Sequence, residues 1–371
     1  MKPESKRLLS IDALRGFDML FIMGFAPLVM EVCALFEGGS EWWISRTMEH
    51  VSWNGLSHHD TIFPLFLFIA GISFPFSYAK QLSNGGSRKS IYIKIIKRML
   101  ILIGLGVVYN GFFNLDFEKI RVASVLGRIG LAWGFAAILY INFKPMTRAI
   151  IAGATLIGYW LLICYVPAPD VPGADPLTMQ GNLIGYVDRL LMPGRLIYDG
   201  GRFDPEGLLS TVPAIVTAML GMFTGEFIRI PEEKISGSRK SLYMAGATAA
   251  MLGLGLLWNI VFPINKMLWS SSFVLVVGAY SLGMFALFYY IIDVKGWQKW
   301  TFFFRVIGMN SITIYMAQKI ISFSSINRFF LGGVVSYVPE AWGAVIFSIG
   351  YLTLSWLFLY FLYKKNTFLK I

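Results

Sequence analysis

The three histidines of this 371-residue chain all lie in one short stretch, MEHVSWNGLSHHD at residues 48–60. An imidazole gains or loses its proton near neutral pH, and a loop imidazole with a carboxylate close by is the usual form of a general base held in one tautomer. We therefore interpret His50 as a candidate general base that Asp60 orients. The alternative is that His50 only belongs to an interfacial aromatic loop.

A metal site is a second interpretation of the same stretch, because His50, His58, His59 and Asp60 all carry atoms that zinc accepts as ligands. Ser57 and Asp60, however, match the Ser-x-x-Asp capping pattern, which predicts a helix beginning near His58. Adjacent residues of a helix point about 100° apart, so His58 and His59 would chelate one ion poorly. We expect no metal.

Composition places this stretch in a membrane protein. Hydrophobic residues make up 56% of the chain and charged residues 14%, and the mean hydropathy is +0.63, whereas soluble domains carry about 25% charged residues. Apolar runs of about 20 residues, enough for a helix to cross the hydrocarbon, recur along the chain. We predict an all-α polytopic membrane protein, a single transmembrane domain over 1–371 with about ten transmembrane helices. The spans are expected near 11–36, 61–79, 92–113, 124–142, 149–166, 208–228, 242–261, 273–292, 302–321 and 342–363.

Lysine and arginine are concentrated in alternate connections, such as 80–98 and 229–240. The positive-inside rule places these connections and both termini in the cytoplasm, and the long segments of about 37–60 and 167–207 outside. No Asn-x-Ser/Thr sequon occurs, which favours a bacterial inner membrane with residues 48–60, here called the histidine loop, on the periplasmic side. The net charge of +11 then reflects topology, so membrane lipid is an expected partner and nucleic acid is not. A homodimer is left open.

Polar side chains inside or beside the apolar runs form a second set of candidates. Arg15 lies between two aspartates in SIDALRGFDML, and Arg128 interrupts the outer half of a predicted span. Charges at membrane depth are costly and mark either a site or an internal ion pair. The acidic groups of the outer segment would suit a cationic acceptor, or would order the loop through salt bridges. The candidates for binding substrate or cofactor are Arg128, Arg15, Asn310, Ser311, Asp204 and Glu206.

Several stretches together resemble the heparan-α-glucosaminide N-acetyltransferase family, in order from about residue 7 to 320. They are RLLSIDALRGFDML, HVSWNGLSHHDTIFPLFLFIAGIS, VASVLGRIGL, GYVDRLL, FDPEGLLSTVPAI, FPINKMLWSSSFV and IIDVKGWQKWTFFFRVIGMNSI. The HxSWNG…DxxFPxFxFIxG block is the specific one.

The resemblance implies a transmembrane enzyme that moves acetyl from cytosolic acetyl-CoA to a glucosamine amine, as in heparan sulfate, on the far side of the membrane. It implies His50, which precedes SWNG, as the catalytic histidine, and places Asn54, Asp60 and Arg128 at further family positions. The chain is expected to be a bacterial relative without the family's lumenal domain. An amino-sugar permease of the same family is the alternative function.

In the expected mechanism, His50 takes a proton from the acceptor amine and Asp60 stabilises the imidazolium. Asn54, or a nearby backbone amide, holds the tetrahedral oxyanion. The anionic nucleotide of acetyl-CoA would rest on the basic cytoplasmic side, with the thioester reaching outward. An acetyl-histidine intermediate is the other course, and the sequence leaves both open.

The lysine and arginine asymmetry predicts the outcome of a topology experiment. Reporter fusions after Lys89, Lys144 and Lys240 are expected to report cytoplasm, and fusions within 167–207 the external side. The measurement is the activity of a reporter that works on only one side of the membrane. A cytoplasmic signal from 167–207 would reverse the orientation and the placement of His50.

Overall fold

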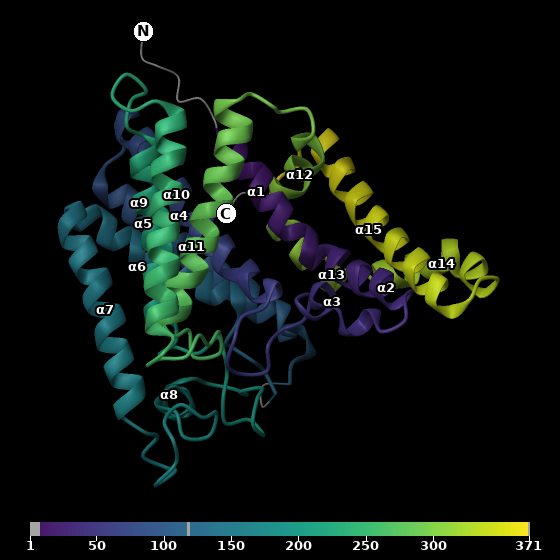
Figure 1. The fold of residues 1–371 in the computed structure, drawn as a ribbon, viewed down its shortest axis with the longest axis horizontal. Helices are drawn as coiled ribbons and strands as arrows, with labels where there is room; N and C mark the ends of the chain where they lie inside the picture. Colours follow the sequence, from purple (N-terminus) through teal and green to yellow (C-terminus); the bar gives the residue numbers. More distant parts are fainter. Residues whose placement is uncertain (1–7, 117–118, 370–371) are drawn as a thin grey trace. The chain divides into compact units, whose positions relative to one another are not determined.

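The computed structural model describes residues 8–116 and 119–369 (Figure 1), which divide into two compact units. The first unit comprises residues 8–51, 57–62 and 284–369, and the second comprises residues 52–56 and 63–283. The two chain ends, predicted to be cytoplasmic, reach into 1–7 and 370–371, outside the described residues. The single domain predicted over 1–371 stays a prediction.

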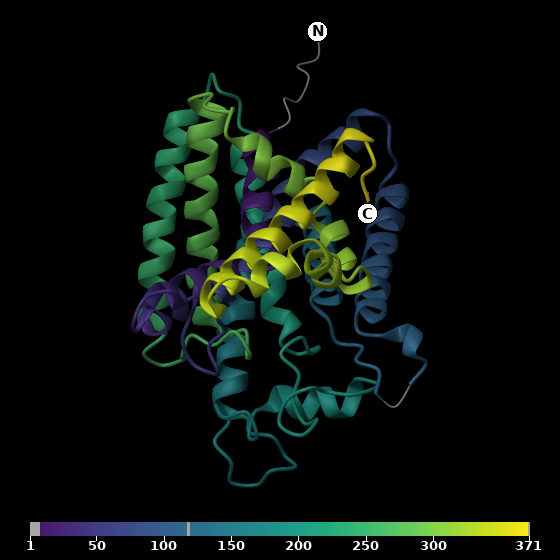
Figure 2. The same cartoon turned by 90° about the vertical axis from the view of Figure 1, so that its right-hand side faces the viewer.

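The first unit is built from helices at both ends of the chain. They are α1 (Leu9–Leu20), α2 (Ala26–Ala34), α3 (Trp43–Arg46), α12 (Thr301–Gly308), α13 (Ser311–Ile320), α14 (Phe323–Ser336) and α15 (Glu340–Lys364). A π-helical segment, Phe21–Phe25, joins α1 to α2, and Tyr289–Val294 is another. Asp293 accepts the backbone N–H groups of Leu9 (3.1 Å) and Ser10 (3.2 Å), and so satisfies donors that the start of α1 leaves open. Helix α14, which was not predicted, packs beside α15 (Figures 1 and 2).

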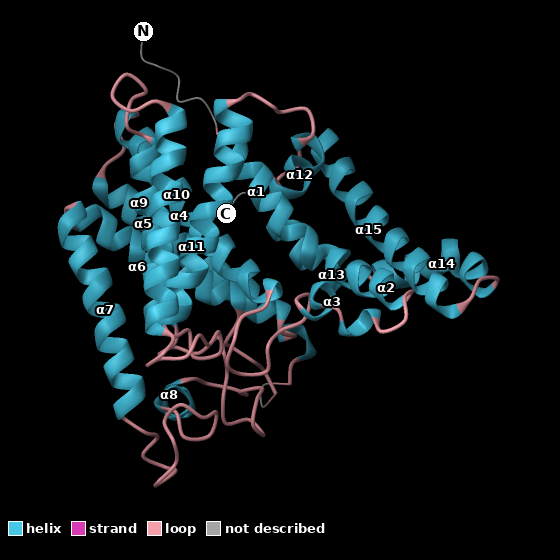
Figure 3. Cartoon of the chain, in the orientation of Figure 1, coloured by secondary structure: helices cyan, strands magenta, loops and turns pink. Residues whose placement is uncertain are grey.

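The second unit holds the middle of the chain. Its helices are α5 (Arg88–Tyr109), α6 (Val125–Asn142), α7 (Pro145–Tyr165), α8 (Leu183–Leu191), α9 (Thr211–Ile228) and α10 (Gly237–Trp258). Helix α4 (His58–Ser83) begins in the first unit and continues in the second, and α11 (Ser271–Phe288) does the reverse. Helix α6 packs against α5 and α9, over a core that includes Phe74, Trp133 and Trp269. Helices make up 70% of the structure and the described residues contain no strand (Figure 3).

Eight helical segments of the described residues are long and apolar enough to cross a membrane. They are Leu9–Ala34, His58–Ser83, Val125–Asn142, Pro145–Tyr165, Thr211–Ile228, Gly237–Trp258, Ser271–Val294 and Glu340–Lys364. The predicted class, an all-α polytopic membrane protein, is confirmed.

Two of the predicted spans are not among these eight. Helix α5 forms over most of 92–113, but Lys94, Lys97 and Arg98 make it too charged to qualify by composition. The single helix predicted over 302–321 is wrong, because the chain breaks between α12 and α13. Asn310 at the break is not helical (φ −128°), and its Oδ1 accepts the hydroxyl of Thr313 (3.3 Å). Such local side-chain bonds compete with a helix.

Helices α1 and α12 approach so closely that only glycine fits at their contact (Figure 1). A Cβ on Gly16 would lie 1.8 Å from the carbonyl oxygen of Phe304, and a Cβ on Gly308 would lie 2.0 Å from that of Asp12. Lipid tails are as apolar as leucine side chains, so helices in a membrane associate largely through close packing of this kind.

Gly16→Ala and Gly308→Ala are each expected to lower the apparent melting temperature of the detergent-purified protein. The added methyl must push two backbones apart, and overpacking of this kind costs about 1 to 3 kcal/mol. Gly153→Ala in α7 is the control, since no atom of the described residues lies within 4 Å of its Cβ position and alanine favours a helix by about 1 kcal/mol over glycine. Equal melting of Gly16→Ala and Gly153→Ala would contradict the close contact.

The 167–207 segment is rich in Pro, Gly and Asp, which predicts irregular backbone with one short helix around 183–191, and its aromatic and apolar content predicts order. The segment is ordered around α8 (loops pink in Figure 3), and Leu183–Leu191 confirms the short helix. Asn182 Oδ1 caps this helix by accepting the N–H of Gly185 (2.8 Å). Ile184 and Phe203 are fully buried in a cluster with Phe262 from the connection between α10 and α11. The segment therefore folds onto the end of its own helical bundle.

Asp188 of α8 is fully buried in this segment, where its Oδ1 accepts the backbone N–H of Leu208 (2.8 Å). Burial raises the pKa of this carboxyl to about 6, because the hydrogen bond from Leu208 offsets desolvation only in part. Between about pH 4 and 6 the folded chain keeps a proton that the unfolded chain has lost. The stability that Asp188 contributes is therefore full below about pH 4 and is lost as the pH rises through about 6.

Asp188→Asn mimics the neutral carboxyl at every pH and should remove this dependence. We expect the melting temperature of the variant, relative to the unmodified chain, to rise from pH 4 to pH 7. The two-unit pKa difference corresponds to about 3 kcal/mol. The measurement is thermal unfolding of both proteins in detergent at several pH values. A difference that does not change with pH would contradict a protonated Asp188 in the folded state.

Candidate active site

The structure brings His50 and Asp60, two of the predicted catalytic residues, into direct contact. His50 follows the short helix α3 and Asp60 lies in the first turn of α4, and His50 Nδ1 is 2.7 Å from Asp60 Oδ1. Because an ionised carboxylate only accepts hydrogen bonds, Nδ1 carries the proton of this bond and the neutral ring has its lone pair on Nε2. The His50 side chain is 50% exposed and that of Asp60 is 1% exposed, so the pair has one buried and one accessible end.

The second oxygen of Asp60 holds the start of α4. Oδ2 accepts the N–H of Val51 (3.3 Å), the N–H of Ser57 (3.2 Å) and the hydroxyl of Ser57 (2.9 Å). The N–H of Asp60 in turn donates to the Ser57 hydroxyl oxygen (3.3 Å), which completes the capping box predicted from the sequence. The predicted helix start at His58 is confirmed. The Asp60 carboxylate therefore fixes both the His50 imidazole and the start of α4, the helix to which Asp60 itself belongs.

His58 and His59 point in different directions. The ring of His58 packs on Phe21, with centroids 4.3 Å apart, and the ring of His59 meets the ring of His50 edge-on at 4.5 Å. Within residues 8–116 and 119–369, no three His, Cys, Asp or Glu side chains form a group that could hold a metal ion. The three histidines are thus close in sequence, with His50 before α4 and His58 and His59 in its first turn, and they do not share a ligand geometry.

Asn54, the third predicted catalytic residue, lies in the second unit. Hydrogen bonds from the residues on either side of it, Trp53 and Gly55, hold its turn in place. Trp53 Nε1 donates to the carbonyl of Leu177 (2.8 Å), and the N–H of Gly55 donates to the carbonyl of Ile264 (2.8 Å). Gly55 has φ +119°, a conformation that other residues rarely adopt. The side chain of Asn54 itself contacts Asn265, whose Nδ2 donates to Asn54 Oδ1 (3.0 Å). Sequence reasoning missed Asn265, although it is a polar residue in the quoted stretch FPINKMLWSSSFV.

Arg128 is buried in the second unit, 2% exposed, among acceptors of the turn before α9. Its Nη2 donates to the carbonyl oxygens of Pro205 and Gly207 and to the hydroxyl of Ser210. The guanidinium also lies 5.0 Å from the centre of the Trp269 ring, a cation–π contact. Its described partners are therefore backbone carbonyls, a hydroxyl and a ring, which hold the guanidinium within the protein.

Asp204 and Glu206 are both bound by Arg121, from the connection between α5 and α6. Arg121 forms a bidentate pair with Asp204, with both N···O distances 2.7 Å, and its Nη2 also donates to Glu206. Burial alone would lower the pKa of Arg121, but the bonds and charges of the two carboxylates raise it instead. This geometry favours the loop-ordering salt bridge that the sequence offered as the alternative to acceptor binding.

The remaining candidates, Arg15, Asn310 and Ser311, belong to the first unit. Arg15 Nη1 lies 3.8 Å from Asp12 Oδ1 within α1, which is the internal ion pair considered from the sequence. Asn310 and Ser311 are buried at the break between α12 and α13, and Asn310 Nδ2 has no hydrogen-bond partner among the described residues. An amide donor without a partner in a buried position is available to a ligand.

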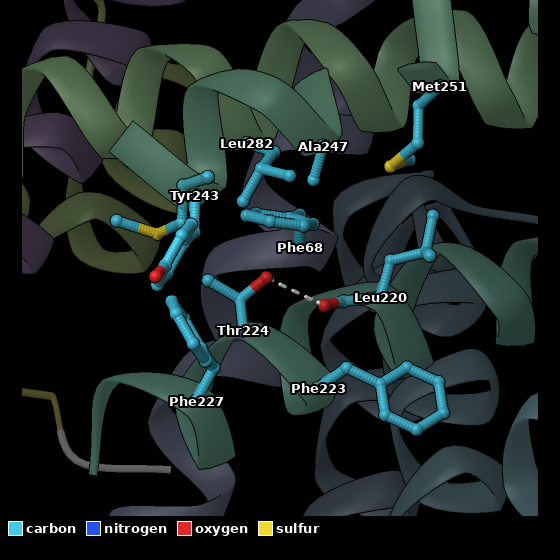
Figure 4. A pocket seen from close by; sticks show the side chains of 10 residues that line it. Phe68, Leu220, Phe223, Thr224, Phe227, Tyr243, Ala247, Met251 and Leu282 are labelled. Atoms are coloured by element: carbon cyan, nitrogen blue, oxygen red, sulfur yellow. Dashed lines mark hydrogen bonds between the residues drawn. The ribbon is translucent and has the colours of Figure 1, made fainter. Parts of the chain in front are cut away.

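An apolar cavity of about 300 Å³ lies inside the second unit, between α4, α9, α10 and α11 (Figure 4). Phe68, Phe223, Phe227 and Leu282 line it, and the hydroxyl of Thr224 is turned to the carbonyl of Leu220 (2.9 Å). This lining offers a surface for an apolar group but no acid–base pair. Of the features described here, the His50–Asp60 pair is the one with an acid–base arrangement.

No protein-family model matches the chain. A curated relative from Mus musculus, heparan-alpha-glucosaminide N-acetyltransferase, is 28% identical over 436 residues, which cover 100% of this chain and 61% of the relative. The protein of the same name from Homo sapiens is 28% identical over 369 residues, which cover 85% of this chain and 53% of the relative. The chain therefore spans between about half and three fifths of the length of these relatives. The predicted resemblance is confirmed, and membership of the chain in this family is supported.

Proposed function

We propose that this member of the heparan-alpha-glucosaminide N-acetyltransferase family transfers an acetyl group from acetyl-CoA to the amine of a glucosamine-type sugar. The observation that carries the proposal is the bond between His50 Nδ1 and Asp60 Oδ1 at 2.7 Å. It supports an imidazole held in one tautomer, half exposed, with its basic nitrogen directed away from the carboxylate.

The proposed chemistry needs one proton transfer in each direction. The amine nitrogen attacks the thioester carbonyl, so a C–N bond forms and the C–S bond breaks. His50 takes the proton that the nitrogen must lose and returns a proton to the departing sulfur of CoA. Asp60 stabilises the imidazolium between these steps, since its carboxylate is buried beside the ring.

The negative charge that develops on the carbonyl oxygen needs a donor, and Asn54 is proposed for it. Its turn is fixed by the backbone bond from Gly55 to Ile264 (2.8 Å), which supports a donor that does not have to reorganise during the reaction. An acetyl-histidine intermediate on His50 is the other course, in which the ring attacks the thioester first.

The other candidates take supporting roles in this proposal. Arg15, Asn310 and Ser311 bind the CoA end on the cytoplasmic side, while Arg128, Asp204 and Glu206 shape the loop that meets the acceptor. We place the protein in a bacterial inner membrane, with the histidine loop facing the periplasm. The acceptor is then a glycan amine outside the cell.

One observation favours the permease alternative. The break between α12 and α13 at Asn310 resembles the interrupted helices that bind substrates in many transporters. The two functions differ in a simple measurement, because only an acetyltransferase releases free CoA when acetyl-CoA and glucosamine are supplied together. A permease would instead move glucosamine into vesicles without acetylating it.

His50→Ala is expected to reduce CoA release by about 10²- to 10⁴-fold, the range for loss of a general base. Binding of acetyl-CoA should survive, because the substitution leaves the proposed CoA residues unchanged. The measurement is the rate of CoA release together with acetyl-CoA affinity for the same purified protein.

His58→Ala is the matched control, since it removes a second imidazole from the same loop, one that packs on Phe21. Its rate should stay within about tenfold of the unmodified chain. If His50→Ala retained near-normal turnover, His50 would not be the base, and the role proposed for Asp60 would fall with it.

A further inference from the structure

Asn265 is held in one position by the connection between α10 and α11. It is fully buried, its N–H donates to the hydroxyl of Ser270 (3.0 Å), and its carbonyl accepts the N–H of Ser270 (3.0 Å). Its side-chain Oδ1 accepts the backbone N–H of Leu268 (2.8 Å). A backbone N–H can bond to the oxygen of an amide but not to its nitrogen, so this contact determines which way the Asn265 amide faces.

The orientation of Asn265 then determines that of Asn54. With its oxygen on Leu268, Asn265 presents Nδ2 to Asn54, and the contact at 3.0 Å requires an acceptor there. Asn54 therefore faces Asn265 with Oδ1, so Nδ2 is the end of its amide that does not make this contact, in a residue that is exposed. A chain of two bonds, from Leu268 through Asn265, sets the polarity of the Asn54 amide.

The backbone at Asn54 cannot by itself determine which end of the side-chain amide, oxygen or nitrogen, faces outward. Trp53 and Gly55 fix the main chain through Leu177 and Ile264, but an amide can be turned by 180° without moving its backbone. One orientation presents a donor outward and the other presents an acceptor. Only the donor can stabilise a developing oxyanion.

We infer that Asn265 is a positioning residue for acetyl transfer, which orients the Asn54 amide so that Nδ2 donates to the carbonyl oxygen of the acetyl group. This role rests on the proposed function. Asn265 does not touch the substrate and acts only through Asn54. The bond to Leu268 makes the arrangement rigid before substrate binds, which is what a preorganised donor requires.

Asn265→Asp tests this role with a change of one atom. The acid keeps an oxygen for Leu268 but faces Asn54 with an acceptor, so the Asn54 amide should turn and present oxygen outward. We expect kcat for CoA release to fall about 10²-fold, the loss seen when an oxyanion donor is removed, with little change in KM for acetyl-CoA. Asn54→Asp, which presents oxygen outward directly, should lose a similar factor.

A double-mutant cycle separates positioning from general damage. In an Asn54→Ala background, Asn265→Asp should lower kcat by less than about twofold, because the residue through which it acts is absent. Asn265→Ser removes the same donor without a buried charge, and provides the same comparison if the acid does not fold. Asn259→Asp is the control in the same connection, since its Oδ1 accepts the N–H of Ile264 (2.7 Å) and the acid keeps that bond.

The outcomes are distinct. An equal fall in kcat in both backgrounds, or no fall in either, would overturn the positioning role of Asn265 while leaving the proposed acetyl transfer intact. Absence of CoA release from the unmodified chain would overturn the proposed function itself, and the role of Asn265 with it.

Discussion

The geometry of the candidate active site depends on the carboxylate of Asp60. One oxygen bonds to the His50 ring (2.7 Å), and the other collects the N–H of Val51 with the N–H and hydroxyl of Ser57. Burying a carboxylate costs free energy unless hydrogen-bond donors surround it. Here the same hydrogen bonds also orient the His50 ring and fix the start of α4. The His50 imidazole is thereby attached to the first turn of a long helix, which positions it more firmly than a free loop could.

Support for the rest of the histidine loop comes from residues far along the chain. The turn at Asn54 is held by Leu177, Ile264 and Asn265, all of the second unit. In the same unit, Arg121 from the connection between α5 and α6 binds Asp204 and Glu206 of the 167–207 segment. These acidic groups therefore tie the segment to a neighbouring connection.

What the sequence predicted well was local or compositional. The membrane class followed from hydropathy, the start of α4 from the Ser57-x-x-Asp60 pattern, and helix α8 from the Pro-, Gly- and Asp-rich sequence around it. The pairing of His50 with Asp60 spans only ten positions and was expected as well. The sequence did not predict that Asn265 bonds to Asn54 or that Arg121 bonds to Asp204. These pairs lie 211 and 83 positions apart, so they leave no local pattern. The break at Asn310 was hidden by an apolar run whose hydropathy alone suggested one helix.

The long separation between Asn54 and Asn265 has a consequence for how the protein is made. Because a chain is made from its N-terminus, the turn at Asn54 is synthesised 211 positions before its partner Asn265. Until the connection between α10 and α11 is in place, the Asn54 amide lacks the neighbour that orients it. The donor proposed at Asn54 therefore matures only when a late part of the second unit folds back against residues made long before.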